Sequence, residues 1–380
     1  MTSSDTDKLA RFLGYLEQDP DNIQLLLDTA ELCFSAGDLA QGEALLDQGL
    51  AKWPAHPALA HRRALLCLQQ NDPTTALALL NSLQGMGHAA PGLAYNLAYA
   101  KYQTQDFSGA LAHLTQLSAD ELAQLPHALH LWVLSLHQLG QLPAARAKAE
   151  QALAQRPEDA EMAGMLSLVC LDDNDAAACL RWGRYSLDHL PDQLHALIAT
   201  GSVDIVESGP DVAIPKLQRA LALAPKAGRA WSALALAYFY QRQFAEAEQA
   251  FEQAVHHMPE HIGTWHAYGW LHLLQGRLDQ AETCFRQALA LDRNFGESYG
   301  GLAVVAHLKG QQAEADPLLA RARRLSPGGI SSRYIDLLQA QSTGDSKAAE
   351  QLVQDAFRNI ESLANRPLSG ETATDIDHPA

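Results

Sequence analysis

Residues 228–259 read GRAWSALALAYFYQRQFAEAEQAFEQAVHHMP, and this stretch decides the fold. Its first half places apolar residues at i, i+3, i+4 and i+7, which form one stripe on a helix: Trp231, Leu234, Ala235 and Tyr238. Its second half carries a further stripe: Ala247, Phe251 and Ala254. Pro259 then ends the second helix. Because small alanines lie where the stripes meet, the stretch predicts two closely packed antiparallel helices.

The same pattern recurs along the chain at a fixed interval, the signature of a repeat array. Prolines are spaced 34 residues apart at these positions: Pro20 and Pro54, then Pro157, Pro191, Pro225 and Pro259. From Pro54 to Pro157 there are 103 residues, which is three periods and one inserted residue. The register predicts ten copies, with these starts: Ile23, Pro57, Pro91, Pro126, Ala160, Leu194, Gly228, Ile262, Gly296 and Ile330.

These residues resemble the tetratricopeptide repeat family over nearly the whole chain. The resemblance implies an all-α fold, an α-solenoid wound as a right-handed superhelix of about ten helix-turn-helix repeats, with a groove lined by the first helices. We expect a capping helix in residues 1–22, the repeats in 23–363 and a disordered, polar tail in 364–380. Intra-repeat turns are predicted at Gly37-Asp38, Asn71-Asp72, Gln105-Asp106 and Gly344-Asp345.

Composition and charge exclude several classes of function. The net charge is −17, whereas nucleic-acid binding needs clustered Lys and Arg, so no nucleic-acid partner is expected. Residues 1–193 hold 23 acidic and 11 basic residues, and this excess leaves open either a basic partner or simple solubility. There is no secretory signal and no apolar run of membrane-spanning length, so membrane insertion is not expected.

We expect a cytoplasmic location, because the five cysteines are odd in number and lack paired spacing. The Ala-, Leu- and Gln-rich style of the sequence favours a bacterial source. Cys33, Cys67 and Cys170 occupy the same apolar seam, which indicates core residues; a redox pair of Cys170 and Cys179 is the alternative.

Few features of the sequence indicate catalytic chemistry. The repeats leave no room for an enzymatic domain, and motifs for phosphate, dinucleotide, zinc-protease or serine-hydrolase sites are absent. The protein is therefore predicted not to be an enzyme, with no catalytic residues and no cofactor. His127, His130 and His137 share one helix face and raise the question of a metal. They lack the companion ligands of a zinc site, so no metal is predicted.

The sixth repeat departs from the pattern. Asp204 lies at the packing position where neighbouring repeats have Tyr238 or Leu136, and Val206 to Pro210 is degenerate. We expect Asp204 to reach solvent, with a ligand contact as the alternative. Residues 200–216 are predicted to form a flexible joint. Gly201 to Val206 is also the only short candidate for a strand.

The resemblance directs certain first-helix residues into the groove, where aromatic rings would anchor a partner. The predicted partner-binding residues are Tyr95, Tyr99, Tyr102, His127, His130, His137, Arg229, Phe239, Tyr240, His266, Trp270 and His307. For Phe239 and Trp270, packing between repeats is an equal alternative.

The sequence thus predicts a scaffold or adaptor that binds a peptide or helical segment of a partner protein. One alternative is a sensor or carrier that holds a small molecule inside the superhelix. Another is a regulatory subunit of a secretion, polysaccharide or signalling system. A monomer is expected, with a dimer as the alternative, because the ends of the array are polar.

Overall fold

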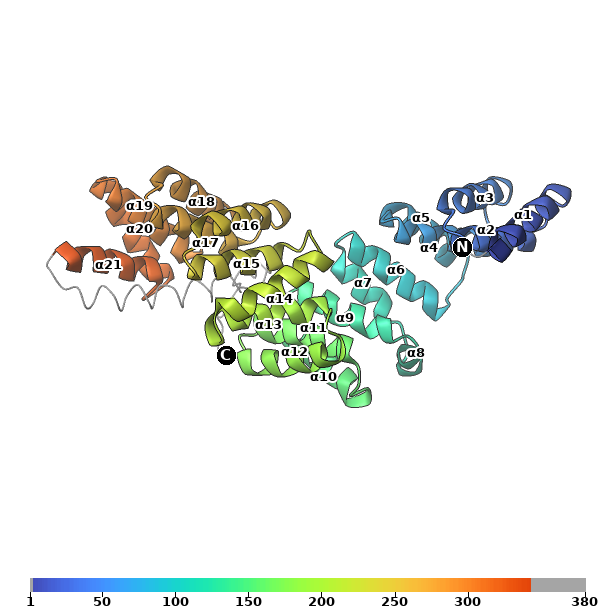
Figure 1. Ribbon diagram of the computed structural model, residues 1–380, viewed down its shortest axis with the longest axis horizontal. Coiled ribbons are helices and arrows are strands. Elements are labelled where there is room, and N and C mark those ends of the chain that lie inside the picture. Colours follow the sequence, from blue (N-terminus) through green and yellow to red (C-terminus); the bar gives the residue numbers. More distant parts are fainter. Residues whose placement is uncertain (1–2, 343–380) are drawn as a thin grey trace, which may run out of the picture. The chain divides into compact units, whose positions relative to one another are not determined.

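The computed structural model of the chain describes residues 3–342, and within them every regular element is an α-helix (Figure 1). After the capping helix α1 (Ser3–Gln18), first and second helices alternate. All ten observed first helices start at the predicted residue, from α2 at Ile23 to α21 at Ile330. The protein is therefore an all-α solenoid of helix-turn-helix repeats.

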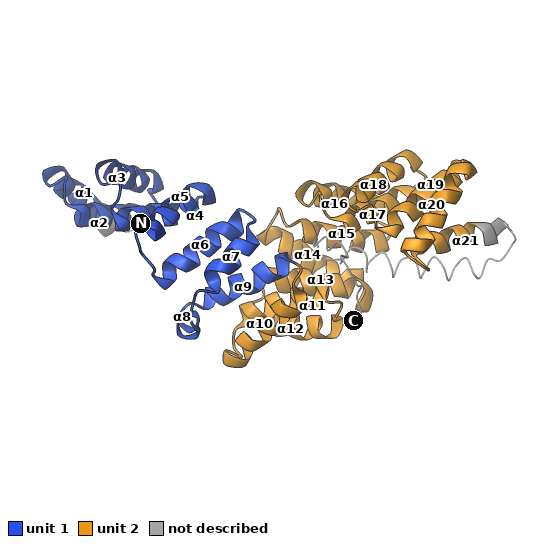
Figure 2. Cartoon of the chain, turned by 180° about the vertical axis from the view of Figure 1, so that it is seen from behind, with its two compact units in different colours: residues 1–139 blue, residues 140–380 orange. Residues whose placement is uncertain are grey.

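The chain divides into two compact units, residues 1–139 and 140–380 (Figure 2). The first unit contains α1, α2 (Ile23–Ser35), α3 (Leu39–Lys52), α4 (Pro57–Gln69), α5 (Pro73–Gly85), α6 (Pro91–Gln103), α7 (Phe107–Leu114), α8 (Ala119–Gln124) and α9 (Pro126–Gln138).

The second unit begins with α10 (Leu142–Gln155), α11 (Ala160–Asp172), α12 (Ala176–His189), α13 (Leu194–Glu207), α14 (Pro210–Leu223) and α15 (Gly228–Tyr240). It continues with α16 (Phe244–His257), α17 (Ile262–Leu274), α18 (Leu278–Leu291), α19 (Gly296–Leu308), α20 (Gln312–Leu325) and α21 (Ile330–Ser342). Within each unit, second helices pack on their own first helix and on the next one, as α12 does on α11 and α13. In the second unit the successive first helices from α11 to α21 also contact each other.

The turn inside each repeat has a recurring backbone geometry. The chain reverses through a residue with positive φ, for example Gly37 at 79° and Asn71 at 60°. In the first three repeats an aspartate follows at once and caps the second helix; Asp38, for instance, accepts a hydrogen bond from the backbone N–H of Gln41 at 3.0 Å. The predicted turns at residues 37, 71 and 105 are therefore present.

A second recurring contact ties the seventh and eighth repeats to the loops before them. The indole Nε1 of Trp231 donates to the carbonyl of Pro225 at 2.8 Å, and Trp265 donates to Pro259 at 2.7 Å, one period later. The tryptophan therefore contributes both apolar area to the stripe and a hydrogen bond to the loop, which explains its place in the pattern.

The inserted residue near the third repeat has a visible consequence. Where other repeats have one second helix, this repeat has the short helix α7 followed by α8. Ser118 starts α8 with a capping box: its Oγ accepts from the N–H of Glu121 at 3.4 Å, and Glu121 accepts from the N–H of Ser118 at 2.8 Å. The extra residue is thus accommodated by breaking one helix.

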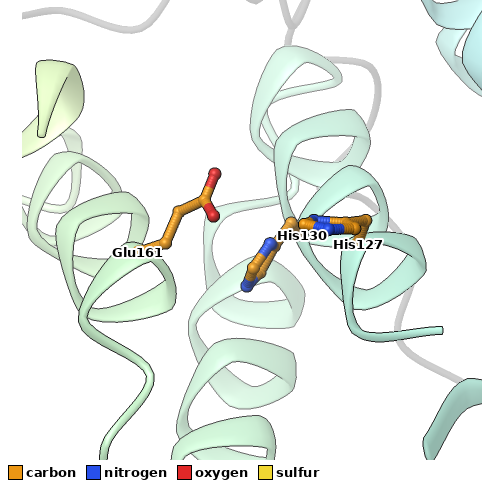
Figure 3. A group of neighbouring side chains, drawn as sticks. All are labelled: His127, His130 and Glu161. Carbon is orange, nitrogen blue, oxygen red and sulfur yellow. The ribbon is translucent and has the colours of Figure 1, made fainter. Parts of the chain in front are cut away.

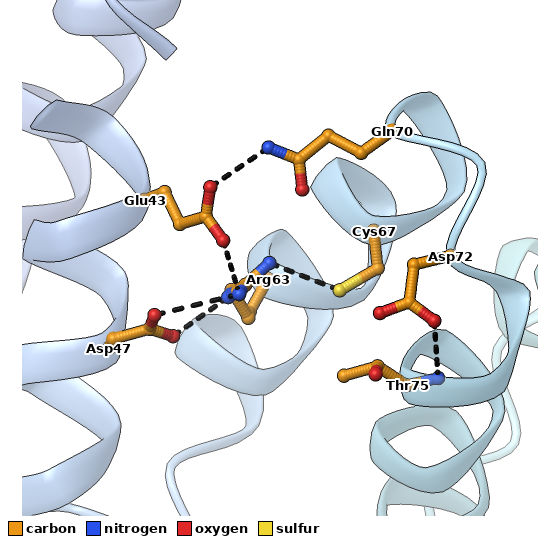
Figure 4. A network of polar contacts seen from close by, with 7 residues as sticks. All are labelled: Glu43, Asp47, Arg63, Cys67, Gln70, Asp72 and Thr75. Carbon is orange, nitrogen blue, oxygen red and sulfur yellow. Dashed lines mark hydrogen bonds and ion pairs between the residues drawn. The ribbon is translucent and has the colours of Figure 1, made fainter. Parts of the chain in front are cut away.

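Polar contacts also join neighbouring repeats in the first unit (Figure 4). Arg63 on α4 donates to Glu43 at 2.6 Å and to Asp47 at 2.7 Å, both on α3. Gln70, at the end of α4, donates to Glu43 at 2.9 Å. Because the Arg63 side chain is only 14% exposed, its aliphatic part packs between the helices while its charge is shared by two carboxylates.

The structure corrects the interpretation of the sixth repeat. Gly201 to Val206 belongs to helix α13 and forms no strand. Asp204 does not reach solvent: it is 1% exposed, and it accepts from Lys216 at 2.5 Å and from Ser208 at 2.7 Å. The expectation failed because Lys216, on α14, brings its ammonium group to the packing seam. The division between the compact units lies at 139/140; a joint at 200–216 stays a prediction.

The five cysteines are buried and free, as the core interpretation predicted. Burial raises the pKa of Cys179 to about 12 and that of Cys170 to about 11, so both thiols stay protonated. In the described part of the chain, no helix combines the length and the apolar character needed to cross a membrane. The predicted turn at Gly344-Asp345, the end of the last repeat and the tail lie outside the described residues.

Candidate functional site: the inner positions of the first helices

The groove predicted from the sequence is built from the second, fifth, ninth, twelfth and thirteenth residues of first helices, and we call the fifth and ninth residues the inner positions. Being four residues apart, they lie on one helix face. Two contacts between repeats support this placement. Trp270, the ninth residue of α17, meets Tyr334, the fifth residue of α21, with ring centroids 5.3 Å apart. Ser202, Ser232 and Leu236, inner residues of α13 and α15, line one small pocket.

In the first unit the inner positions of α6 carry a pair of stacked aromatic rings. Tyr95 and Tyr99 have centroids 6.3 Å apart and planes at 17°, and both are half-buried. Tyr102 packs edge-on against Phe107 at 5.2 Å. Burial raises the pKa of the Tyr102 phenol, which also hydrogen-bonds Gln138. The row is thus held by its neighbours while part of each ring stays accessible.

Polar groups accompany this aromatic row. The side-chain amide of Asn96 lies 3.2 Å from Nε2 of His61, the fifth residue of α4. Burial, together with the adjacent Arg62, lowers the pKa of His61, so its imidazole is neutral at pH 7. Arg62 itself pairs with Glu31 at 2.9 Å. The first unit therefore offers aromatic faces beside neutral hydrogen-bonding groups.

Helix α9 carries the three predicted histidines, and they differ in exposure. His127 is exposed, whereas His130 and His137 are 6% and 8% exposed. The rings of His127 and His130 stand edge to face, with centroids 5.7 Å apart. Figure 3 draws this pair on α9 together with Glu161, which lies on α11 in the second unit. Within the first unit the neighbouring pair of His127 and His130 supplies two imidazoles, and a structural zinc site requires four ligands.

The second unit buries most of its predicted anchors. Phe239 is 1% exposed, Trp270 2% and His266 0%, so none of these rings is accessible. The groove prediction placed His266 at the surface, whereas for Phe239 and Trp270 burial was an equal alternative. Trp270 packs against Phe285 and donates to Nε2 of His266 at 2.9 Å. The alternative of packing between repeats therefore holds for Trp270, which contacts Tyr334 on α21, while Phe239 is buried with its ring beside Phe244 of its own repeat.

Arg229 is committed to a partner inside the second unit. Its guanidinium forms a two-pronged ion pair with Asp172 on α11, with the Nη1–Oδ2 distance at 2.8 Å. The Asp172 side chain is 1% exposed and that of Arg229 24%. Tyr240 and His307 remain half-buried, and His307 lies 3.0 Å from the side-chain oxygen of Gln312.

An exposed apolar row in the second unit was missed from the sequence. The thirteenth residues of α13, α17 and α19 are Val206, Leu274 and Leu308, each 40–41% exposed, with Tyr240 at the same position of α15. We call these four residues the edge row. Their spacing of 34 residues is the sequence signal that indicates this row. It was missed because the predicted groove residues were aromatic or polar, and three of the four members of the row are aliphatic.

Comparisons with known proteins agree with this architecture. A profile described as tetratricopeptide repeat matches residues 27–94, 130–192 and 206–261, and a second of the same description matches 238–304. The general transcriptional corepressor ssn6 of Schizosaccharomyces pombe is 36% identical over 86 residues, 22% of this chain. The corepressor trfA of Dictyostelium discoideum is 29% identical over 115 residues, 30% of this chain. The matched segments span 8% of the length of each corepressor.

A solved structure of the human IFIT1 dimer with m7Gppp-AAAA is similar over most of its length. The alignment covers 96% of this chain and 94% of that one, with 14% identity and a TM-score of 0.55. At this identity the likeness shows a shared fold alone.

Proposed function

Because this chain belongs to the tetratricopeptide repeat family, we propose that it is a non-catalytic scaffold whose first unit binds a segment of a partner protein along its inner positions. The observation that carries the proposal is the half-buried, stacked pair of Tyr95 and Tyr99, continued by Tyr102. Rigid rings supply contact area at low entropic cost, and tyrosines are enriched among the residues that dominate binding energy.

The partner is proposed to be an extended or helical peptide segment. Apolar side chains would lie against the ring faces, and the pair formed by His61 and Asn96 would hydrogen-bond polar groups of the peptide. The exposed imidazole of His127 lies on α9 and would contribute at the margin. A cytoplasmic location and a monomeric state belong to the same proposal, and fractionation and light scattering test them.

The test is crosslinking in native lysate followed by identification of the captured proteins. Tyr99→Ala removes the central ring, which should cost about 2 kcal/mol, roughly a 30-fold loss of affinity. Tyr95→Ala serves as a second variant, because Tyr99 packs against two buried clusters whereas Tyr95 packs against one of them. Tyr15→Ala is the matched control, since Tyr15 is a tyrosine on α1 that is 53% exposed.

Circular dichroism melting shows whether each variant is folded. The proposal stands if folded Tyr99→Ala and Tyr95→Ala lose a partner that the wild type and Tyr15→Ala retain. If both folded variants keep every partner, the aromatic row is not the binding surface.

A further inference from the structure

Helix α12 of the second unit (Figure 2) carries a cluster of aromatic and basic side chains. Arg181, Arg184 and His189 are exposed, whereas Trp182 and Tyr185 are half-buried. Successive residues of an α-helix are turned by about 100°, so the five positions share one arc of about 160°. They therefore form one continuous surface, which we call the α12 patch.

The rings of the α12 patch are held in place by contacts within the second unit. Trp182 and Tyr185 meet edge to face, with centroids 6.5 Å apart and planes at 85°. The centroids of Tyr185 and His189 are 4.5 Å apart. The hydroxyl of Tyr185 donates to the carbonyl of Pro157 at 2.7 Å, and Nδ1 of His189 donates to the carbonyl of Tyr185 at 2.8 Å. Because the rings are already ordered, a partner that covers them loses little further conformational freedom.

The two arginines of the α12 patch are not neutralised by acidic side chains. The guanidinium of Arg181 lies 4.8 Å from the centroid of the Trp182 ring. Within the part of the chain that the structure describes, neither Arg181 nor Arg184 forms an ion pair. Asp175, which caps α12, accepts instead from Arg146 at 2.9 Å. Both guanidinium groups are therefore available for carboxylates, which they can bind through two parallel hydrogen bonds.

The repeat architecture does not account for the rings of the α12 patch. At the position of Trp182, the other described second helices of this unit have Lys148, Lys216, Ala250, Cys284 and Leu318. At the position of Tyr185 they have Gln151, Arg219, Gln253, Gln287 and Arg321. In addition, Nε1 of Trp182 is buried and has no hydrogen-bond acceptor among the described residues, which costs stability that a leucine would keep. Trp182 thus departs from the pattern of the fold, as residues at binding sites commonly do.

We propose that the α12 patch is a second interaction surface, which binds an acidic segment of a partner protein. Carboxylates of the segment pair with Arg181 and Arg184, and its apolar side chains lie against Trp182 and Tyr185. Tryptophan, tyrosine and arginine are the residue types that most often dominate the energy of protein interfaces. Asp188, exposed on the last turn of α12, gives the site a direction, because it repels carboxylates from the carboxyl end of the helix.

An acidic protein segment fits this surface better than a nucleic acid does. A nucleic acid carries a charge at every phosphate, and its affinity depends on many basic contacts. The α12 patch offers two arginines in a chain with a net charge of −17. A short run of carboxylates beside apolar side chains matches both the charge and the rings. This surface goes beyond the proposed function, since a scaffold with a binding site in each unit would hold two proteins at once.

Fluorescence anisotropy with the full-length protein tests this surface. The probe is a labelled peptide in which pairs of glutamates alternate with single leucines, and the same peptide with glutamine in place of glutamate is the reference. We expect the glutamate peptide to bind about tenfold more tightly, because charge-assisted hydrogen bonds are stronger than neutral ones. Its affinity should fall as salt is added.

The double variant Arg181→Glu with Arg184→Glu should weaken binding of the glutamate peptide about tenfold or more, and should strengthen binding of a peptide with lysine in place of glutamate. Such an exchange of preference does not result from misfolding. Trp182→Leu introduces the residue that α20 has at this position, Leu318, and should also weaken the glutamate peptide about tenfold. Arg286→Glu is the matched control: Arg286 lies at the position of Arg184 in α18 and is 70% exposed, and its replacement should leave the affinity unchanged.

Three outcomes overturn the proposal. One is equal binding of the glutamate and glutamine peptides to the wild type. Another is a folded double variant that keeps the wild-type affinity for the glutamate peptide. The third is tighter binding of single-stranded poly-uridine, which would assign the α12 patch to a nucleic acid. If Trp182→Leu does not fold, the exposed arginines still decide. Tyr99→Ala should leave the glutamate peptide bound, so the failure of either surface can be recognised without the other.

Discussion

Arg242 adopts a backbone conformation that the next two repeats give to glycine. Its φ is 59°, and the equivalent residues Gly276 and Gly310 have φ of 74°. The left-handed region costs a non-glycine residue about 1–2 kcal/mol, while glycine loses about 0.5–1 kcal/mol through chain entropy. We therefore expect Arg242→Gly to stabilise the protein by about 0.5–1 kcal/mol, measured as a rise in melting temperature.

The converse substitution provides the control for this turn. Gly276→Ala places a Cβ at positive φ and should lower stability by about 1 kcal/mol. A lower melting temperature for Arg242→Gly would show that Arg242, which is exposed, makes a contact worth more than the strain.

His266 predicts a pH dependence at the residue scale. Complete burial lowers its pKa from 6.5 to about 3, and its Nε2 accepts from Trp270, which requires the neutral imidazole. A depressed histidine pKa means that the unfolded chain binds the proton more readily. The stabilisation is therefore present above about pH 6.5 and is lost progressively as the pH falls towards 3.

His266→Gln keeps a hydrogen-bond acceptor but does not titrate. The test compares the denaturant midpoints of the wild type and this variant at about pH 7.5 and at about pH 4.5. These two pH values lie above and below the ordinary histidine pKa. The wild type should lose more stability than the variant on acidification. Equal losses would mean that His266 is protonated in the folded state.

The same residues show where sequence reasoning stopped at this scale. Trp270 and His266 were assigned to one face of their helix by the family resemblance, and their spacing of four residues agrees with a shared face. Their exposure depends on Phe285 in the same repeat and on Tyr334 two repeats further on. That contact is set by how successive helix pairs stack, which a stripe on one helix does not encode.

At the scale of elements, α13 and α14 are joined by the ion pair of Asp204 with Lys216, whose side chains are 2% and 28% exposed. Lys216→Met leaves the carboxylate buried with Ser208 as its remaining hydrogen-bond donor. We expect a loss of about 2–3 kcal/mol, below the range for a fully buried pair because Lys216 reaches water.

The double variant Asp204→Leu with Lys216→Met supplies the contrast. It removes both charges and places at this position the leucine that the fourth repeat has as Leu136, so it should regain most of the lost stability. Urea unfolding of the wild type, of Lys216→Met and of the double variant compares their free energies of unfolding. If the double variant is no more stable than Lys216→Met alone, the pair is not the reason that Asp204 tolerates burial.

Element boundaries were the best-predicted level of this fold. The ten first-helix starts follow from proline, turn and stripe signals that lie within one repeat, and each recurs often enough to correct the others. The prediction that Asp204 reaches solvent failed because Lys216, which pairs with it, lies on the following helix. The position of the break between α7 and α8 was not predicted either. One inserted residue shows that the register of the repeats shifts, but it does not show where along the backbone the extra residue is accommodated.

On the scale of the whole molecule, each compact unit has its own buried residues. Leu80 is 0% exposed in a cluster of the first unit, and Leu217 is 0% exposed in the second. Truncating a buried leucine to alanine costs about 2–5 kcal/mol. Because stability in repeat arrays is transmitted chiefly between neighbours, Leu80→Ala should lower the unfolding midpoint of residues 1–139 far more than that of the second unit.

Hydrogen exchange at increasing urea concentration, followed separately for peptides of the two units, gives this measurement. Leu217→Ala is the reciprocal variant and should act mainly on residues 140–342. Equal shifts in both units for each variant would show that the array unfolds as one cooperative block.

The divided second helix of the third repeat shows how the array contains an error in length. Each unit of such an array contacts chiefly its neighbours, so an irregularity can be contained within one unit. The other described repeats keep an undivided second helix. The next first helix, α9, begins at Pro126, and the spacing of 34 residues between first-helix starts then continues to α21. The array therefore tolerates a length error in one unit without passing it to the next.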